Sequence, residues 1–239
     1  MADAVGESVV KPDHLDRARL VKIYNGVDTE RFRPPTPDES GAARAKFGLQ
    51  PTDFVVGMVA GFRPEKNHRM LFEGAMAALP RIPGLKVLAV GDGPLIEEFR
   101  SRYPGSLAVF AGDTRDVTTA LWAMDVGSLL PSMNEGFSNA VIEKMAAGLP
   151  MIVTDVGGNA EAVFEGENGY VVPPRDAGRF TAALIGLHAD AEGRRAMGRR
   201  SRELVEQKFS LPQMCASHVA LYRMLCAADP ARPAQAEQG

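Results

Sequence analysis

Short apolar runs alternate with segments of helical length through the middle of the chain, and a turn rich in glycine or charge follows each run. The apolar runs span residues 54–60, 85–90, 107–111, 126–130 and 151–154. Strands that alternate with helices in this way predict a parallel, doubly wound α/β sheet. In such a sheet ligands bind at the carboxyl ends of the strands, so these turns should line one edge and form the binding site.

The segment from Ser132 to Glu161 joins a strand end, a turn, a short apolar helix and a second strand. Ser138 is expected to cap the helix by accepting a backbone N–H, and Gly148 to end it in a left-handed conformation. The start of this helix offers N–H groups and a positive dipole end to a phosphate. Glu135 and Glu143, on either side of that site, are suited to accept hydrogen bonds from hydroxyls such as those of ribose and a sugar.

This segment resembles the signature of retaining glycosyltransferases of the GT-B architecture, family-4 type. The shared features are Pro-Ser, Glu-Gly-Phe, a second Glu eight positions after the first, Met-Ala-x-Gly-x-Pro, and Gly-Gly-x-x-Glu. The resemblance implies that Glu135 contacts the hydroxyls of the donor sugar and that Glu143 holds the ribose of the nucleotide. The substrate-binding residues implied in the turn, where backbone N–H groups face the diphosphate, are Gly136, Phe137 and Ser138.

A second loop, residues 61–68, resembles the Gly-Arg-x-x-x-Glu-Lys loop of the same family, whose Arg and Lys bind the two phosphates. Lys66 matches the pattern, whereas Gly61 takes the position of the arginine and Arg63 follows two residues later. The resemblance implies catalytic roles for Lys66 and, by proximity, for Arg63, because cations stabilise the charge that develops on a leaving nucleotide. The other interpretation is that both are solvated loop charges.

Other turns complete the predicted donor site. By resemblance, Gly91 and Gly93 border the nucleotide, and the backbone around Asp116 and Val117 faces the base. The two glycines do not form a dinucleotide-binding fingerprint, because the third glycine of that motif is missing, and this disfavours an oxidoreductase. Lys144 stands where the family usually has Ala, and it is expected to face solvent.

The resemblance also implies a domain organisation. Residues 1–30 are interpreted as the remnant of a linker from a missing N-terminal domain, because the hinge that enters the second domain of these enzymes is similar to this part of the chain. Residues 31–210 are expected to form a Rossmann-like nucleotide-sugar-binding domain. Residues 211–228 should form a C-terminal helix and residues 229–239 a disordered tail. The chain would then be the donor half, and the acceptor half a separate domain or chain.

Further local expectations concern the two ends of the predicted domain. Residues 35–41 read as a polar loop before a short helix. Residues 176–188, 192–208 and 211–227 read as three helices. The second helix is rich in arginine, which leaves open a peripheral contact with anionic lipid, although interspersed glutamates favour an ion-paired, solvated face. The arginines concerned are Arg194, Arg195, Arg199, Arg200 and Arg202.

Charge and composition argue against several classes of partner and cofactor. The net charge of −3 argues against a nucleic-acid partner. Cys215 and Cys226 lack metal-ligand spacing and are expected to form a buried reduced pair, and the four histidines are scattered, so neither a metal nor a cofactor is expected. The sequence shows no signal peptide and no run of 18 apolar residues, which predicts a cytoplasmic protein without a transmembrane segment.

Together these features predict the donor-binding domain of a hexosyltransferase, which transfers a sugar with retention from a nucleoside-diphosphate sugar to an unknown acceptor. Two alternatives stay open. The first is a non-catalytic nucleotide-sugar-binding module or one subunit of a split enzyme. The second is a sugar-nucleotide epimerase, which would turn over the nucleotide sugar without an acceptor.

Overall fold

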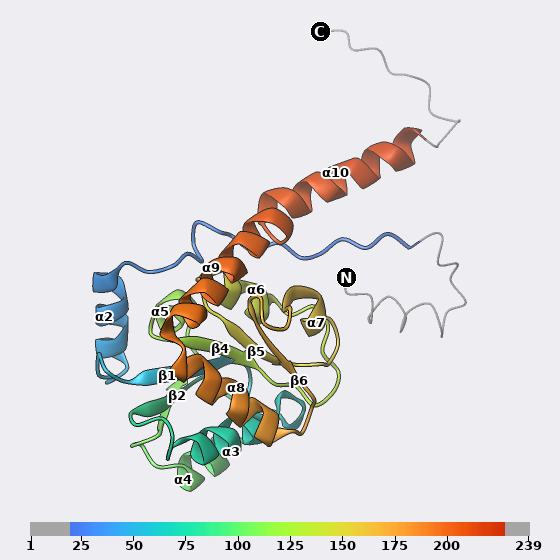
Figure 1. Ribbon diagram of the computed structural model, residues 1–239. Coiled ribbons are helices and arrows are strands. Elements are labelled where there is room, and N and C mark those ends of the chain that lie inside the picture. Colours follow the sequence, from blue (N-terminus) through green and yellow to red (C-terminus); the bar gives the residue numbers. More distant parts are fainter. Residues whose placement is uncertain (1–19, 228–239) are drawn as a thin grey trace.

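Six parallel strands form one sheet at the centre of the molecule, in the order β3-β2-β1-β4-β5-β6 (Figure 1). The computed structural model describes residues 20–227, so the expectations for residues 1–19 and for the tail at 229–239 lie outside the described residues. The strands are β1 Phe54–Val59, β2 Leu85–Val90, β3 Ala108–Gly112, β4 Val126–Leu129, β5 Met151–Thr154 and β6 Gly169–Val172.

The four inner strands are buried along nearly their whole length. A parallel strand that is covered on both faces reads as a continuous apolar run rather than as an alternating one. This explains why β1, β2, β4 and β5 are recognisable in the sequence. Strand β6, which begins with a glycine and lies at the edge of the sheet, was not among the predicted strands.

Helices cover both faces of the sheet, and each face has its own apolar core (Figure 1). On one face lie α3 His68–Ala78, α4 Ile96–Arg102 and α8 Ala177–Ala189. On the other lie α2 Pro37–Lys46, α5 Val117–Trp122, α6 Asn139–Ala146, α7 Asn159–Ala162 and α9 Ala191–Lys208. The prediction of a single doubly wound, Rossmann-like domain with a helical C-terminal part is therefore confirmed.

Helix α2 begins earlier than expected, inside the segment that reads as a polar loop. Thr36 is its N-cap, and the Thr36 side chain accepts from the N–H of Glu39 while the Glu39 carboxylate accepts from the N–H of Thr36. Pro37 occupies the first helical position, where its missing N–H costs nothing. The expected loop at 35–41 is therefore wrong, because this capping box starts the helix within it.

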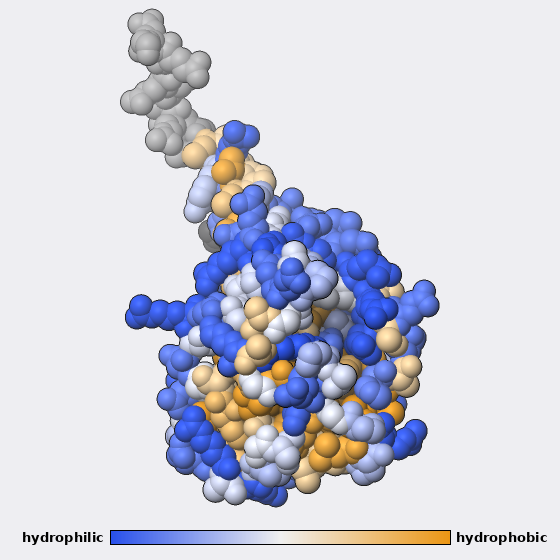
Figure 2. Space-filling model, turned by 90° about the vertical axis from the view of Figure 1, so that its left-hand side faces the viewer, coloured by the Kyte–Doolittle hydropathy of each residue, from blue (hydrophilic) through white to orange (hydrophobic). Residues whose placement is uncertain are grey.

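Helix α10, Leu211–Ala227, extends away from the body of the molecule, and none of its residues is buried (Figure 1). Hydrophobic residues are visible along its exposed surface (Figure 2); the large ones are Leu211, Val219, Tyr222, Met224 and Leu225. Cys215 and Cys226 are both exposed on this helix. The expectation of a buried cysteine pair is therefore wrong, since α10 does not pack into the core.

Three arginines of α9, Arg194, Arg200 and Arg202, bond to acidic side chains or carbonyls, whereas Arg195 and Arg199 are exposed. Arg200 forms ion pairs with Glu167 and Glu203, and Arg202 pairs with Glu206 at 2.6 Å. Arg202 also donates from Nη1 to three main-chain carbonyls, which joins α9 to α6 and to the N-terminal segment. The acceptors are Thr29 (3.0 Å), Phe32 (2.8 Å) and Ala146 (2.9 Å).

The N-terminal segment runs beside the junction of α9 and α10. The N–H of Val27 donates to the carbonyl of Phe209 at 2.8 Å, and the N–H of Leu211 donates to the carbonyl of Val27 at 3.0 Å. This pairing fixes the segment against the domain. Within residues 20–227 no helix has the length and apolar character needed to cross a bilayer.

Candidate active site

The loops that follow neighbouring strands are joined to one another by backbone hydrogen bonds along the carboxyl edge of the sheet. These bonds connect the loops after β3, β2, β1, β4 and β5 into one continuous wall. With the N–H donor first, they are Gly91 to Gly112 (2.8 Å), Phe62 to Asp92 (2.9 Å), Ser132 to Glu65 (2.9 Å) and Gly158 to Gly136 (2.9 Å). The turns that carry the predicted site residues therefore share one edge, as a parallel sheet requires.

Lys66 and Glu135 meet where the loops after β1 and β4 touch. Nζ of Lys66 donates to Oε2 of Glu135 at 2.8 Å, and the two side chains are 26% and 11% exposed. The residues are far apart in sequence but adjacent in space, because β1 pairs with β4. Two of the three predicted catalytic residues thus lie in contact, with the ammonium partly accessible from solvent.

Arg63, the third predicted catalytic residue, is exposed just before the short 3-10 helix η2 Pro64–Lys66. Its Nε lies 3.9 Å from the place that a Cβ on Gly61 would occupy, so the guanidinium lies beside the position where the family has its arginine. It also borders a cavity of about 260 Å³ between α3 and α4. Arg63 forms no ion pair within the described range of 20–227, which leaves its charge available to an anion.

Gly91 and Gly93 lie where the loops after β1 and β2 touch. Both have positive φ angles, +132° and +154°. A Cβ on Gly93 would stand 2.7 Å from the carbonyl oxygen of Phe62, and a Cβ on Gly91 would overlap the carbonyl of Ala60. Both glycines are therefore required by the close approach of the two loops, and this structural role stands beside their predicted role at the nucleotide.

The turn that carries Gly136 and Phe137 leads into α6, but the helix start differs from the prediction. Ser138 precedes the first helical residue, Asn139, with the extended backbone of an N-cap, yet its side chain accepts no capping hydrogen bond. The predicted side-chain cap is therefore wrong, and the turn is held instead by the backbone bond from Gly158 to Gly136. Because the hydroxyl of Ser138 does not cap them, the first N–H groups of α6 stay suited to an anion.

Glu143 lies on α6 and is half-buried. Burial raises the pKa of its carboxyl group, while the charges of Lys144 and Arg31 act in the opposite direction and lower it. The ionised form of a partly dehydrated carboxylate is a strong acceptor for hydroxyl groups. This environment suits the predicted contact with a ribose.

Lys144 is fully buried, so the expectation that it faces solvent is wrong. Its side chain packs over β4, where a Cβ on Gly127 would stand 2.8 Å from the Cδ of Lys144. Nζ donates to the carbonyl of Ala140 at 2.9 Å. Burial lowers the pKa of Lys144 to about 8, while the nearby charges of Glu143 and Glu135 raise it. The glycine in β4 provides the space that makes this burial possible.

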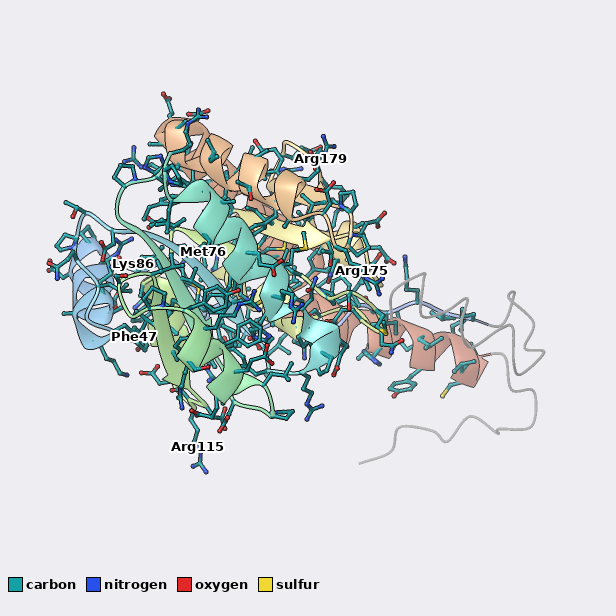
Figure 3. The ribbon with its side chains drawn as sticks, turned by 90° about the horizontal axis from the view of Figure 1, so that it is seen from below. Phe47, Met76, Lys86, Arg115, Arg175 and Arg179 are labelled. Atoms are coloured by element: carbon teal, nitrogen blue, oxygen red, sulfur yellow. The ribbon has the colours of Figure 1, made fainter. Side chains whose placement is uncertain are left out.

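Asp116 and Val117 stand at the start of α5, on the loop after β3. Asp116 is exposed and caps α5 by accepting from the N–H of Thr119, and it also pairs with Lys46 at 2.8 Å. These bonds lower the pKa of its carboxyl group, the bond from Lys46 most strongly. The neighbouring Arg115 projects away from the body (Figure 3). Among residues 20–227, no ion pair links Asp116 to Lys66 or Glu135.

An aromatic cluster behind the turn was not found by sequence reasoning. The ring of Tyr24 lies 4.8 Å from that of Phe137 and 5.2 Å from that of Phe209, measured between centroids. The hydroxyl of Tyr24 donates to Oε2 of Glu161 at 2.7 Å. The N-terminal segment thus supports the turn that carries Phe137. Its only signal in the sequence is a tyrosine inside the hinge-like stretch.

His68 follows the loop after β1, and its side chain lies in the core. Its ring is buried and stacks on Phe62 with 3.9 Å between centroids. Burial lowers the pKa of His68 to about 4, so the ring is neutral at neutral pH. Across residues 20–227, His, Cys, Asp and Glu side chains form no group of three or more that could hold a metal ion.

The edge of the sheet therefore combines three kinds of group. Arg63 and Lys66 supply cations, the start of α6 supplies N–H donors, and Glu135 and Glu143 supply acceptors. Cations and N–H groups together are suited to a diphosphate, and the carboxylates to hydroxyl groups. The arrangement can bind a molecule that carries both.

Comparison with protein families gives a match that spans all six strands of the sheet. The family model described as "Glycosyl transferases group 1" matches residues 53–190. EpsD of Bacillus subtilis is 32% identical over 82% of this chain and 53% of its own length. The "UDP-Gal:alpha-D-GlcNAc-diphosphoundecaprenol alpha-1,3-galactosyltransferase" of Escherichia coli is 31% identical over 77% of this chain and 49% of its own length. The chain spans about half the length of the curated relatives it matches.

Solved structures show the same fold. HepE of Anabaena, in complex with UDP and glucose, superposes with a TM-score of 0.82 over 95% of this chain and 61% of its own, at 21% identity. The sucrose-phosphate synthase of Thermosynechococcus elongatus superposes with a TM-score of 0.79 over 94% of this chain and 57% of its own, at 27% identity. At such identity the likeness to HepE concerns the fold alone.

Proposed function

Because the chain belongs to the group 1 glycosyltransferases, we propose that it is the donor-binding domain of a retaining hexosyltransferase that uses a nucleoside-diphosphate sugar. The observation that carries the proposal is the contact between Lys66 and Glu135 at the carboxyl edge of the sheet. It puts a partly exposed cation and a carboxylate, from two separate motifs, beside the start of a helix. A diphosphate-linked sugar has the matching groups.

Each predicted residue then has a role in binding. Lys66 and Arg63 hold the diphosphate together with the N–H groups at Gly136, Phe137 and the start of α6. Glu143 accepts from the ribose hydroxyls. When the donor binds, Glu135 gives up part of its contact with Lys66 and accepts hydrogen bonds from the hydroxyls of the donor sugar instead. The loops around Gly91 and around Asp116 and Val117 border the nucleoside.

Catalysis follows from the same contacts. When the bond between the anomeric carbon and the diphosphate oxygen breaks, negative charge develops on the departing diphosphate. Cations and N–H dipoles that are already in place stabilise this charge. Lys66, Arg63 and the start of α6 supply such groups, so we propose that the reaction proceeds without a bound metal ion or cofactor. Retention of configuration is part of the proposal and is carried by the motif resemblance.

The acceptor side of the reaction lies outside this domain in the proposal. Relatives are about twice as long as the matched part, and we propose that a separate domain or chain binds the acceptor. A cytoplasmic location also belongs to the proposal.

The test is a calorimetric titration of the chain with UDP-glucose, UDP-galactose, GDP-mannose and ADP-glucose. These probes include the donor types that the names of the Escherichia coli relative and of the HepE complex suggest. We expect selective binding to one base. Lys66→Ala and Glu143→Ala should each weaken it by about tenfold to a hundredfold, the usual loss of a charge-assisted hydrogen bond. Lys86→Ala, which removes a charge at the amino end of β2, is the matched control and should bind like the wild type.

Two outcomes contradict the proposal at different levels. Unchanged affinity in both site variants would show that the residues are wrongly assigned. Absence of binding to all four probes would contradict the proposed function itself. Incubation of the bound donor without acceptor then distinguishes a catalytic domain, which releases free nucleotide slowly, from a module that only binds.

A further inference from the structure

The ring of Tyr24 packs against the turn that carries the candidate diphosphate-binding N–H groups. Its centroid lies 4.8 Å from that of Phe137 in the turn and 5.2 Å from that of Phe209, which directly follows α9. The rings of Phe137 and Phe209 are themselves 5.1 Å apart. Because Phe209 is buried in the core, this triangle of rings ties the half-buried Phe137 to a fixed point of the domain.

The hydroxyl of Tyr24 bonds to a second element that supports the same turn. It donates to Oε2 of Glu161 on α7 at 2.7 Å. Nζ of Lys22 lies 3.4 Å from the same oxygen and 4.8 Å from the centroid of Tyr24. Burial raises the pKa of Tyr24, so the hydroxyl keeps the proton that it donates. One tyrosine thus contacts both the turn and α7.

Main-chain hydrogen bonds complete a closed ring of contacts around the turn. The N–H of Gly158, at the start of α7, donates to the carbonyl of Gly136 at 2.9 Å, and the N–H of Glu161 donates to the carbonyl of Gly158 at 3.1 Å. The contacts therefore run from Tyr24 through Phe137 and Gly136 to α7, and return to Tyr24 through Glu161. A turn that is held in this way has few alternative positions.

The attachment of the N-terminal segment does not by itself explain these contacts. Val27 already fixes that segment through its main-chain bonds with Phe209 and Leu211. The residue after Tyr24, Asn25, donates from Nδ2 to Oδ1 of Asn139, the first residue of α6, at 3.0 Å. Two consecutive side chains of the segment therefore reach the turn and the helix start where an anion is expected to bind.

We propose that Tyr24 is a positioning residue of the donor site, which fixes the turn at Gly136 and Phe137 so that its N–H groups are in place for the diphosphate of a nucleotide sugar. This inference rests on the proposed function of the site. Tyr24 acts through Phe137 and Glu161 and not by touching the donor. N–H groups that are already in place spare the ligand the entropic cost of ordering the turn.

The inference predicts a loss of affinity that is confined to the diphosphate. The turn at Gly136 serves the phosphates, whereas other loops border the nucleoside in the proposed function. Tyr24→Leu removes the ring and the hydroxyl, and it should weaken the binding of UDP by about fivefold to twentyfold and that of uridine by less than about twofold. Tyr24→Phe keeps the ring and should restore the affinity for UDP to within about threefold of the wild type.

The experiment compares these variants of the chain with the wild type. UDP is titrated by calorimetry, and uridine, which binds more weakly, by NMR. Tyr170→Leu is the matched control, because Tyr170 is a partly buried tyrosine on the edge strand β6. It should bind both probes like the wild type. Wild-type affinity of Tyr24→Leu for UDP would overturn the inference, and so would equal losses for UDP and uridine, which would indicate a general loosening of the domain.

A second measurement keeps the inference separate from the function on which it rests. If the wild type does not bind UDP, hydrogen exchange of the Gly158 amide, which donates to Gly136, decides the inference. Faster exchange in Tyr24→Leu than in Tyr170→Leu would support the positioning of the turn, and equal exchange would overturn it. If Tyr24→Leu does not fold, Tyr24→Met takes its place in both measurements.

Discussion

The α-carbon of Gly157 packs directly against the main-chain carbonyl oxygen of Glu135. Gly157 has a φ of +63°, and a Cβ there would overlap this oxygen. The loop after β5 therefore supports the turn that carries the candidate sugar-binding carboxylate. Position 157 should tolerate glycine alone, for reasons of both space and backbone conformation.

Gly157→Ala should lower the free energy of unfolding by about 2–4 kcal/mol, because left-handed strain and overlap act together. The matched control is Gly166→Ala, since Gly166 has a φ of +76° but nothing within 4 Å of a Cβ. Strain alone should cost about 1–2 kcal/mol there. Urea denaturation of the two variants measures the difference. Equal losses would mean that the contact with Glu135 relaxes without cost.

The ion pair between Lys66 and Glu135 predicts opposite effects for its two members on the affinity for UDP. Lys66→Met removes a phosphate ligand and should weaken binding by about tenfold to a hundredfold. Glu135→Gln releases Lys66 from its partner, so UDP, which has no sugar for Glu135 to hold, should bind at least as tightly as to the wild type. Calorimetry with UDP decides this. A loss in Glu135→Gln as large as that in Lys66→Met would show that the carboxylate supports the phosphate site rather than competing for the lysine.

Arg202 should contribute more to the unfolding free energy than its neighbours on α9. Arg202→Met leaves the carbonyls of Thr29, Phe32 and Ala146 without their donor, and we expect a loss of about 2–4 kcal/mol in unfolding free energy. Arg200→Met, on the same helix, removes ion pairs with two glutamates whose side chains are more than half exposed. It should change the unfolding free energy by less than about 1 kcal/mol. Thermal and urea unfolding compare the two, and similar losses would refute the role of the three carbonyls.

Glu39 should make the stability of α2 depend on pH. A bidentate contact with Arg33, at 2.6 and 2.9 Å, and the N–H of Thr36 lower the pKa of this carboxyl group from 4.5 to about 2. A group with a lowered pKa in the folded state stabilises it above the unfolded pKa, and the effect is lost as the pH falls from about 4.5 to about 2. Glu39→Gln should therefore lower Tm at neutral pH and match the wild type near pH 2. Asp38→Asn, in the same helical turn, keeps the capping box and serves as the control; a Glu39→Gln difference that is constant with pH would contradict the assignment.

The strands and the order of the site loops follow from local patterns in the sequence, and the exceptions have physical reasons. The inner strands β1, β2, β4 and β5 are visible because burial on both faces leaves uninterrupted apolar runs. Strand β6 is hard to recognise in the sequence, because it begins with a glycine and its Tyr170 is only partly buried. The start of α2 is masked by two prolines, although the spacing of Thr36 and Glu39 is that of a capping box.

The candidate site was predictable as a set of residues but not as a set of contacts. Spacing along the chain cannot show that β1 lies next to β4, and the pair of Lys66 and Glu135 depends on that neighbourhood. The burial of Lys144 depends in the same way on a glycine in another element. The exposure of the two cysteines depends on where α10 points, which its own sequence does not determine. The assigned roles of the site residues stay predictions until donor binding is measured.

The backbone bonds between successive loops have a consequence for how a ligand would be received. Glu65 is joined to Ser132, and Gly136 to Gly158, by main-chain hydrogen bonds that form when the domain folds. The loss of conformational entropy in these loops therefore belongs to folding and is not repeated at each encounter. A nucleotide that fits this edge would meet a preorganised surface. Its association should be a single kinetic step whose rate is set by diffusion and electrostatic attraction, with no slow rearrangement of the domain.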